Sequence, residues 1–366
     1  MMKKSRNANM DLLRIVSMLL IVFLHSIDHS GVLEHAENCG TAMYFYVRFT
    51  YMLCQVCVNI YVMLSGYFLV TSKFRLKKLV TLWMEAAFYS VVIRLIFMLT
   101  GARPFSIVSL LSCFAPILTG RYWFITIYVG LYLIFPFLNI LIGAMDKKQH
   151  ALLNICLFGL FGLWSSIHPS IAGMNSGGGW GLAWFAVLYL AAAWLRLYYE
   201  PKGKAVRWLA VFVTIPVLVA LAQVVSNLLG IGIFQTILKN WFRYDSAPVY
   251  LMTMGLFVGF LNIRIGNEKW ANLIRFVAPL TFGVYLIHAH ADVSPWSWEV
   301  LNMPEKMDSA LFPLTQLCVV LGIFAVCAAI DGIRKHTVGK LENHQLLDIL
   351  CNKVSACVCK VLELVK

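Results

Sequence analysis

The residues of this sequence with the clearest capacity for chemistry lie in one apolar stretch near its start. Residues 10–30 carry Asp11, Arg14 and His25 among mostly hydrophobic side chains. In an α-helix the interval from Arg14 to His25 places both side chains on nearly the same face, roughly 16 Å apart along the axis, and Asp11 lies one turn before Arg14. Ionisable groups within an apolar helix are costly in a bilayer unless they face a protein interior or a wet cavity. The spacing therefore predicts that this face of the helix lines a functional site.

The two side-chain types on that face suit acyl transfer. Imidazole exchanges a proton near neutral pH and can activate a hydroxyl for attack on an acyl carbonyl. The guanidinium of Arg14 is always charged and its planar shape matches phosphate groups. Together they fit a phosphate-bearing acyl donor that reaches His25 from the side of Arg14. The alternatives are a hydrogen-bonded core histidine and an arginine whose charge reaches the membrane surface, and the shared intramembrane face favours function.

The rest of the chain must supply the helices that position these residues. Hydrophobic residues make up 60% of the 366 residues and charged residues 13%, whereas soluble domains are about 25% charged. Apolar stretches of membrane-spanning length predict an all-α, polytopic integral membrane protein with about ten transmembrane helices. The expected spans are 10–29, 43–70, 79–99, 121–142, 150–167, 180–199, 206–229, 247–263, 274–291 and 311–331. We expect residues 1–340 to form one transmembrane domain and residues 341–366 a cytoplasmic amphipathic tail.

The distribution of basic residues predicts the orientation of these spans. The formal net charge is +13. Of the Lys and Arg residues in the loops and at the span ends, 19 lie on one side, which comprises the segment before the first span, alternate connections and the residues just after the last span, and five lie on the other side. Because basic residues are retained on the cytoplasmic side, both termini are predicted to be cytoplasmic. The positive charge is thus explained by topology, and nucleic acid is not an expected partner.

This topology brings residues from distant spans to one depth. His25 near the end of the first span and His288 near the end of the ninth are predicted to lie level in the outer leaflet, close to Arg121 and Trp123 at the start of the fourth span. Asp245 at the start of the eighth span is expected at a similar depth. We predict a pocket there that combines imidazole, carboxylate, guanidinium and indole groups. Four further residues are expected to be solvated rather than catalytic: Asp28, His29, Asp245 and His290. Glu85 and Arg94 are expected to pair with residues of other helices.

Metal and nucleotide sites are not indicated. Most of the ten cysteines lie inside apolar spans, and no His or Cys set has the spacing of a zinc site. The sequence also contains no Walker-type phosphate loop, no GxSxG elbow in the loops and no HExxH motif. No bound metal is therefore expected.

Four stretches resemble the membrane acyltransferase family 3, whose members O-acetylate extracytoplasmic polysaccharides and related glycans. They are NMDLLRIVSMLLIVFLH at 9–25, LSGYFL at 64–69, YWFITIYVGLYLIFPFLN at 122–139 and TFGVYLIH at 281–288. The resemblance implies ten transmembrane helices, acetyl-CoA or another short acyl-CoA as the cytoplasmic donor, and His25 as the residue essential for transfer. Arg14 would help to hold the donor, and Trp123 and His288 would line the site.

These observations together predict an O-acyltransferase in a cell membrane, expected to be a bacterial plasma membrane. It would transfer an acyl group, expected to be acetyl, from acyl-CoA to a hydroxyl of an extracytoplasmic or lipid-linked glycan. The candidate catalytic residues are His25, Arg14 and Asp11, and the candidate substrate-binding residues are Arg121, Trp123 and His288. A transporter or flippase of a glycan intermediate or small solute is the alternative, with the polar stripe as its path. A purely structural subunit fits the intramembrane charges least well.

Overall fold

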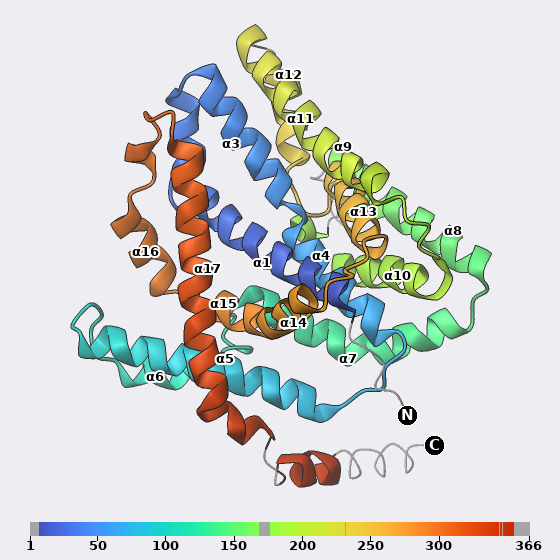
Figure 1. The fold of residues 1–366 in the computed structure, drawn as a ribbon, viewed down its shortest axis with the longest axis vertical. Coiled ribbons are helices and arrows are strands. Elements are labelled where there is room, and N and C mark those ends of the chain that lie inside the picture. Colours follow the sequence, from blue (N-terminus) through green and yellow to red (C-terminus); the bar gives the residue numbers. More distant parts are fainter. Residues whose placement is uncertain (1–6, 168–175, 231, 344, 346, 355–366) are drawn as a thin grey trace.

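The structure, a computed structural model, describes residues 7–167, 176–230, 232–343, 345 and 347–354. Within these ranges the chain forms helices and no β-strand (Figure 1). This confirms the predicted all-α, polytopic fold. The helices are α1 (Ala8–Asp28), α2 (Val32–His35), α3 (Thr41–Cys54), α4 (Val56–Leu69), α5 (Leu76–Leu99), α6 (Ile107–Cys113), α7 (Trp123–Gly143), α8 (Lys147–Leu157), α9 (Trp164–Ile167), α10 (Leu182–Tyr198), α11 (Ala205–Leu229), α12 (Gly232–Asn240), α13 (Ala247–Leu261), α14 (Glu268–Val277), α15 (Thr281–His288), α16 (Val293–Leu301) and α17 (Phe312–His336).

Each of the ten predicted spans coincides with helix in the structure. Eight helical segments among the described residues are long and apolar enough to cross a membrane. They include α3 and α4, which join into one segment of 29 residues, and α14 and α15, which join through a short 3-10 turn. The remaining two, α10 and α13, are apolar but shorter. The count of ten spans and the cytoplasmic position of the termini stay predictions.

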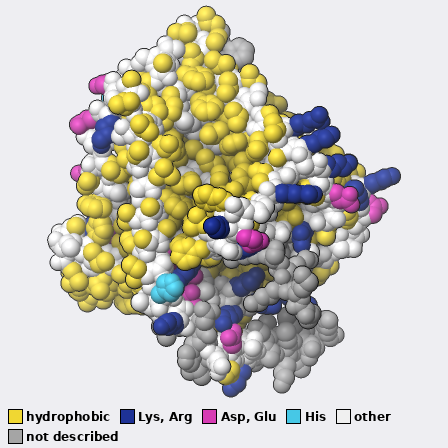
Figure 2. All heavy atoms as spheres, in the orientation of Figure 1, with side chains coloured by type: hydrophobic (Ala, Val, Ile, Leu, Met, Phe, Trp, Pro, Cys, Tyr) yellow, Lys and Arg dark blue, Asp and Glu magenta, His cyan; other side chains and the backbone are white. Residues whose placement is uncertain are grey.

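The outer surface of the helices is hydrophobic, as a lipid-facing surface must be. Large apolar side chains such as Leu99, Leu118 and Val206 are more than three-quarters exposed. Figure 2 shows hydrophobic side chains over most of one face, with Lys and Arg gathered along the right and lower edges. Since soluble monomers rarely expose apolar patches of this extent, the surface supports a multi-pass membrane protein.

Helix α1 lies at the centre of the molecule. It contacts α3, α4, α13, α14, α15 and α17, and Figure 1 shows it crossing between them. Its buried residues, among them Met10, Leu13, Met18 and Val22, form part of the main hydrophobic core. The helix that carries Arg14 and His25 is therefore surrounded by protein over much of its length.

Close packing of α15 against α17 depends on a glycine. A Cβ atom placed on Gly283 would lie 2.2 Å from the carboxylate carbon of Asp331. Asp331 is fully buried, and it accepts hydrogen bonds from Tyr89 on α5 at 2.9 Å and from Arg334 at 2.8 Å. This contact fixes the position of α15, the helix that ends at His288.

A Gly283→Ala substitution is expected to destabilise the protein by about 1–3 kcal/mol, because the added methyl group overpacks a buried contact. The measurement is the thermal unfolding midpoint of the full chain in detergent. Gly322→Ala on α17 is the matched control, since a Cβ there meets no atom within 4 Å. Equal midpoints for the two variants would show that the α15 contact yields without cost.

Glu85 and Arg94 pair with other helices, as expected. The Glu85 carboxylate lies 3.4 Å from Arg334 of α17, and Arg94 lies 3.1 Å from Asp292, which follows α15. Both pairs connect α5 to the C-terminal part of the bundle. The predicted amphipathic tail, 341–366, lies partly outside the described residues, at 344, 346 and 355–366. In its described part, Asp348 pairs with Lys77 at the start of α5, at 2.8 Å.

Candidate active site

Two histidines from helices remote in sequence meet at the C-terminal end of α1. His25 Nδ1 on α1 and His288 Nε2 on α15 lie 3.1 Å apart. His288 Nδ1 lies 2.6 Å from the backbone carbonyl oxygen of Val284. The level positions that the topology predicts for these two imidazoles thus correspond to direct contact.

The carbonyl of Val284 determines which nitrogen of each neutral ring carries a proton. A carbonyl oxygen only accepts, so His288 must donate from Nδ1, and its Nε2 is then an acceptor. His25 must donate from Nδ1 to that acceptor. The remaining nitrogen of His25, Nε2, therefore carries a lone pair. This chain of hydrogen bonds orients His25 as a base.

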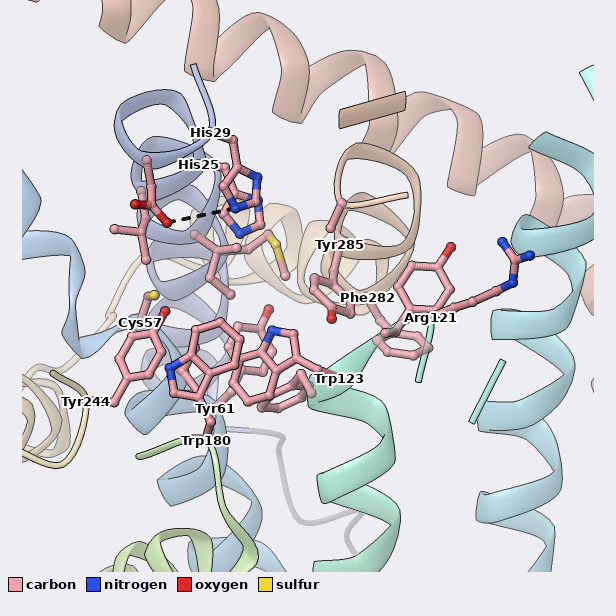
Figure 3. A pocket seen from close by; sticks show the side chains of 18 residues that line it. His25, His29, Cys57, Tyr61, Arg121, Trp123, Trp180, Tyr244, Phe282 and Tyr285 are labelled. Atoms are coloured by element: carbon pink, nitrogen blue, oxygen red, sulfur yellow. Dashed lines mark ion pairs between the residues drawn. The ribbon is translucent and has the colours of Figure 1, made fainter. Parts of the chain in front are cut away.

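His25 lies on the wall of a cavity. The cavity encloses about 190 Å³ and is lined mainly by apolar and aromatic side chains from α1, α4, α7 and α15 and from the segments before α10 and α13. Figure 3 shows Trp123, Trp180, Tyr61 and Tyr244 grouped below the two stacked rings of His25 and His29. We call this space the histidine cavity. The cavity is large enough for the reactive end of a substrate. Because His25 lines it, a substrate bound there would contact this side chain.

His29 extends the imidazole cluster. Its ring stacks on that of His25 with the centroids 4.3 Å apart. Its Nε2 lies 3.9 Å from the carboxylate of Asp28, and its Nδ1 lies 3.2 Å from the hydroxyl of Ser294. Asp28 and His29 are both exposed, as expected from the sequence. Both residues also line the histidine cavity, so they belong to the site although they are exposed.

Trp123 lines the histidine cavity. Its indole lies 4.2 Å, centroid to centroid, from that of Trp180 and 6.4 Å from the ring of Tyr244. These rings form one wall of the histidine cavity. The structure therefore brings together His25, His288 and Trp123 from α1, α15 and α7.

Arg121 lines the histidine cavity, but its guanidinium forms hydrogen bonds with α6. The guanidinium donates to the hydroxyl of Ser112 at 2.7 Å and to the carbonyl of Ser109 at 3.3 Å, both on α6. Figure 3 shows the guanidinium turned away from the histidines. In this arrangement Arg121 attaches α6 to the start of α7 beside the cavity.

Arg14 and Asp11 pair with each other, at 3.2 Å, and neither belongs to the described lining of the histidine cavity. Tyr61 connects the two places: its hydroxyl donates to the backbone carbonyl of Arg14 at 3.3 Å, and the residue also lines the cavity. The Arg14 side chain is about a quarter exposed. Arg14 therefore lies nearer the start of α1 than the histidine cavity, and the shared face of Arg14 and His25 stays a prediction.

The expectation that Asp245 is solvated is wrong. Asp245 has no exposed surface, and its carboxylate accepts two hydrogen bonds from Arg243, both at 3.0 Å. Ser165 and Ser176 also donate to it, at 2.9 and 2.5 Å. The physical reason is that the segment before α13 folds inward, since Asn59 in the core donates to the carbonyl of Tyr244 at 2.8 Å. A buried carboxylate requires this full set of donors.

The same expectation is wrong for His290, which is 1% exposed. It lies beside Asp292, which is 2% exposed and pairs with Arg94 and Arg103 at 3.1 and 3.0 Å. His290 therefore belongs to a buried cluster that connects α5 to the segment after α15.

Three residues of the cavity have no signal in the sequence that singles them out. Tyr61, Trp180 and Tyr244 lie in or beside apolar stretches, where an aromatic residue normally packs against lipid or core. Tyr285 differs, because it lies three residues before His288 and so shares its helix face. Among the described residues no group of three or more His, Cys, Asp or Glu side chains has the arrangement of a metal site.

The fold and the site define a class: a helical, multi-pass membrane protein with a histidine cavity between its helices. The family model of acyltransferase family 3, described as an acyltransferase domain, matches residues 7–332. The chain therefore belongs to that family. Neither the curated proteins nor the solved structures include a significant match.

Proposed function

We propose that this acyltransferase transfers an acyl group, in the simplest case acetyl, from cytoplasmic acyl-CoA to a hydroxyl group of an extracytoplasmic or lipid-linked glycan. The observation that carries the proposal is the orientation of His25: its Nδ1 faces His288, so that its Nε2 is left with the lone pair that a general base needs. Membership of the acyltransferase family supports transfer of an acyl group in general. Beyond acyl transfer in general, we propose the identity of the donor, the identity of the acceptor and the direction of transfer across the membrane.

In the proposed reaction His25 handles one proton. The hydroxyl of the acceptor gives its proton to His25 Nε2 while its oxygen attacks the thioester carbonyl. The carbon–sulfur bond then breaks and the new ester remains. The sulfur of CoA takes the proton back from His25 Nε2, so that CoA leaves as the thiol. His288 accepts from His25 Nδ1 throughout, which holds the ring in the required tautomer. Each atom and proton is accounted for without a metal.

Arg14 and Asp11 would act on the donor rather than on the reacting carbonyl. Arg14 lies toward the start of α1, and its backbone carbonyl accepts a hydrogen bond from Tyr61. A guanidinium there suits the phosphates of CoA, and Asp11 at 3.2 Å orients it. The pantetheine arm would then extend past Tyr61 to the histidine cavity, a distance of roughly 16 Å along the helix. Arg121 would support the site through α6, and Trp123 would line it.

The proposal is tested with the full chain in sealed vesicles and isotopically labelled acetyl-CoA. Mass spectrometry of the glycan should show the label only when acetyl-CoA is supplied on the side of the N-terminus. Label transfer from the opposite side, or glycan movement across the membrane without CoA release, would contradict it, and the second outcome would indicate the transporter alternative. The proposed setting is a bacterial plasma membrane, so vesicles from such cells are the first choice.

A further inference from the structure

A second cavity adjoins the histidine cavity and differs from it in chemistry. It encloses about 320 Å³ and shares four lining residues with the first: Leu24, Asp28, Trp180 and Tyr244. The remaining lining includes the polar side chains of Tyr51, Gln55 and Arg243 and the backbone of Gly177 and Gly178. We call this space the polar cavity.

The polar cavity lies next to His25, the proposed base. Asp28 follows His25 by three residues on α1, so the two side chains lie on adjacent turns of one helix face. Trp180 belongs to both cavities and is about half exposed. A molecule bound in the polar cavity against Trp180 therefore has a short path to His25.

The groups in the polar cavity are those that recognise sugars. The carboxylate of Asp28 can accept hydrogen bonds from sugar hydroxyl groups, and the carboxamide of Gln55 and the phenol of Tyr51 can both donate and accept. Gln55 lies where α3 ends and α4 begins and is 4% exposed, so its position is fixed by the packing of both helices. The flat, apolar face of an indole such as Trp180 packs against the C–H face of a pyranose ring.

The charges in the polar cavity disfavour an anion. The one guanidinium in its described lining is that of Arg243. Two of its nitrogens, Nε and Nη2, already donate hydrogen bonds to the carboxylate of Asp245. Asp245 lies outside this lining, so Asp28 supplies the one carboxylate in it. Because Asp245 already balances the charge of Arg243, an acidic sugar or a phosphate would meet the negative charge of Asp28, and like charges in a partly buried site repel.

We propose that the polar cavity is the acceptor subsite and that it binds an uncharged pyranose. The hydroxyl groups of the sugar hydrogen-bond with Asp28 and Gln55, and one ring face packs on Trp180. The acyl thioester occupies the histidine cavity on the other side of Trp180. This assignment rests on the proposed function, but sugar binding can be measured without any donor.

The experiment is saturation-transfer difference NMR with the full chain in nanodiscs. The probes are the neutral methyl β-glycosides of glucose, galactose and N-acetylglucosamine, and methyl β-glucuronide as the charged counterpart of the glucoside. At least one neutral probe should bind, and the glucuronide should bind about tenfold more weakly than the glucoside. Gln55→Ala and Trp180→Ala should each weaken binding about tenfold, the effect of losing roughly 1.4 kcal/mol.

Matched controls separate a local effect from a general one. Trp270→Ala removes an exposed indole on α14, and Gln235→Ala removes a glutamine on α12; neither lines the polar cavity. Both controls should bind like the unaltered protein. Gln55→Lys adds a cation to the polar cavity and should strengthen binding of the glucuronide relative to the glucoside.

Three outcomes overturn the subsite: no signal from any neutral probe, equal signals from glucoside and glucuronide, or equal losses in Trp180→Ala and Trp270→Ala. His25→Ala should still bind the sugar. Retained binding in that variant together with unchanged acyl transfer would contradict the proposed function and leave the subsite standing. The two failures are therefore distinguishable.

Discussion

Replacement of His25 by alanine is expected to lower acyl transfer by about 10²–10⁴-fold, the range for loss of a general base. The reason is that Nδ1 of His25 is engaged with His288 at 3.1 Å, which leaves the lone pair on Nε2, and that His25 lines the histidine cavity. The measurement is the rate of label transfer from acetyl-CoA to glycan at saturating substrates, in vesicles with equal amounts of inserted protein.

His25→Gln is the matched variant for that experiment. Its side-chain amide can still donate to His288, so the buried nitrogen keeps a partner, but an amide does not take up the proton of a hydroxyl. Both variants should therefore lose activity to a similar extent while their thermal unfolding midpoints stay close to that of the unaltered protein. Substantial transfer by His25→Gln would assign the proton to another group and refute the mechanism.

Replacement of His288 is expected to have the next largest effect, through the orientation of His25. In His288→Phe the Nδ1–H of His25 loses its acceptor, the second tautomer becomes populated, and kcat should fall by about 10–100-fold, less than the full loss of a general base. KM for acetyl-CoA should change little, because His288 is not among the described lining of the histidine cavity.

His288→Gln is the rescue variant, since its carboxamide oxygen can accept from His25 Nδ1. It should recover much of the kcat lost in His288→Phe. A structural role for His288 predicts a different pattern, in which both variants lower the unfolding midpoint and kcat follows the amount of folded protein. The split between kcat and KM and the rescue by glutamine separate the two roles.

The sequence by itself determined the helices and the face of α1 that carries the chemistry. The ten predicted apolar stretches are all helical, because each one satisfies its own backbone hydrogen bonds within the stretch. The placement of Arg14 and His25 on one face follows from the helical repeat alone. The level positions of His25 and His288 follow from the alternation of spans, and the structure brings these two rings into contact.

The tertiary structure decided which groups at one depth meet. Depth does not specify rotation about a helix axis or the course of a loop, and both depend on contacts between distant segments. The guanidinium of Arg121 turns to Ser112 on α6, and Asp245 is enclosed by Ser165, Ser176 and Arg243. Neither arrangement follows from periodicity.

The polar cavity depends still more on the assembled fold. Asp28, Gln55 and Trp180 come from the end of α1, the junction of α3 and α4, and the segment before α10. Each residue considered separately is an ordinary polar or aromatic residue near the end of a span. Local sequence specifies the helices through backbone hydrogen bonding and hydrophobicity, whereas a binding site built from several helices exists only once their side chains have packed together.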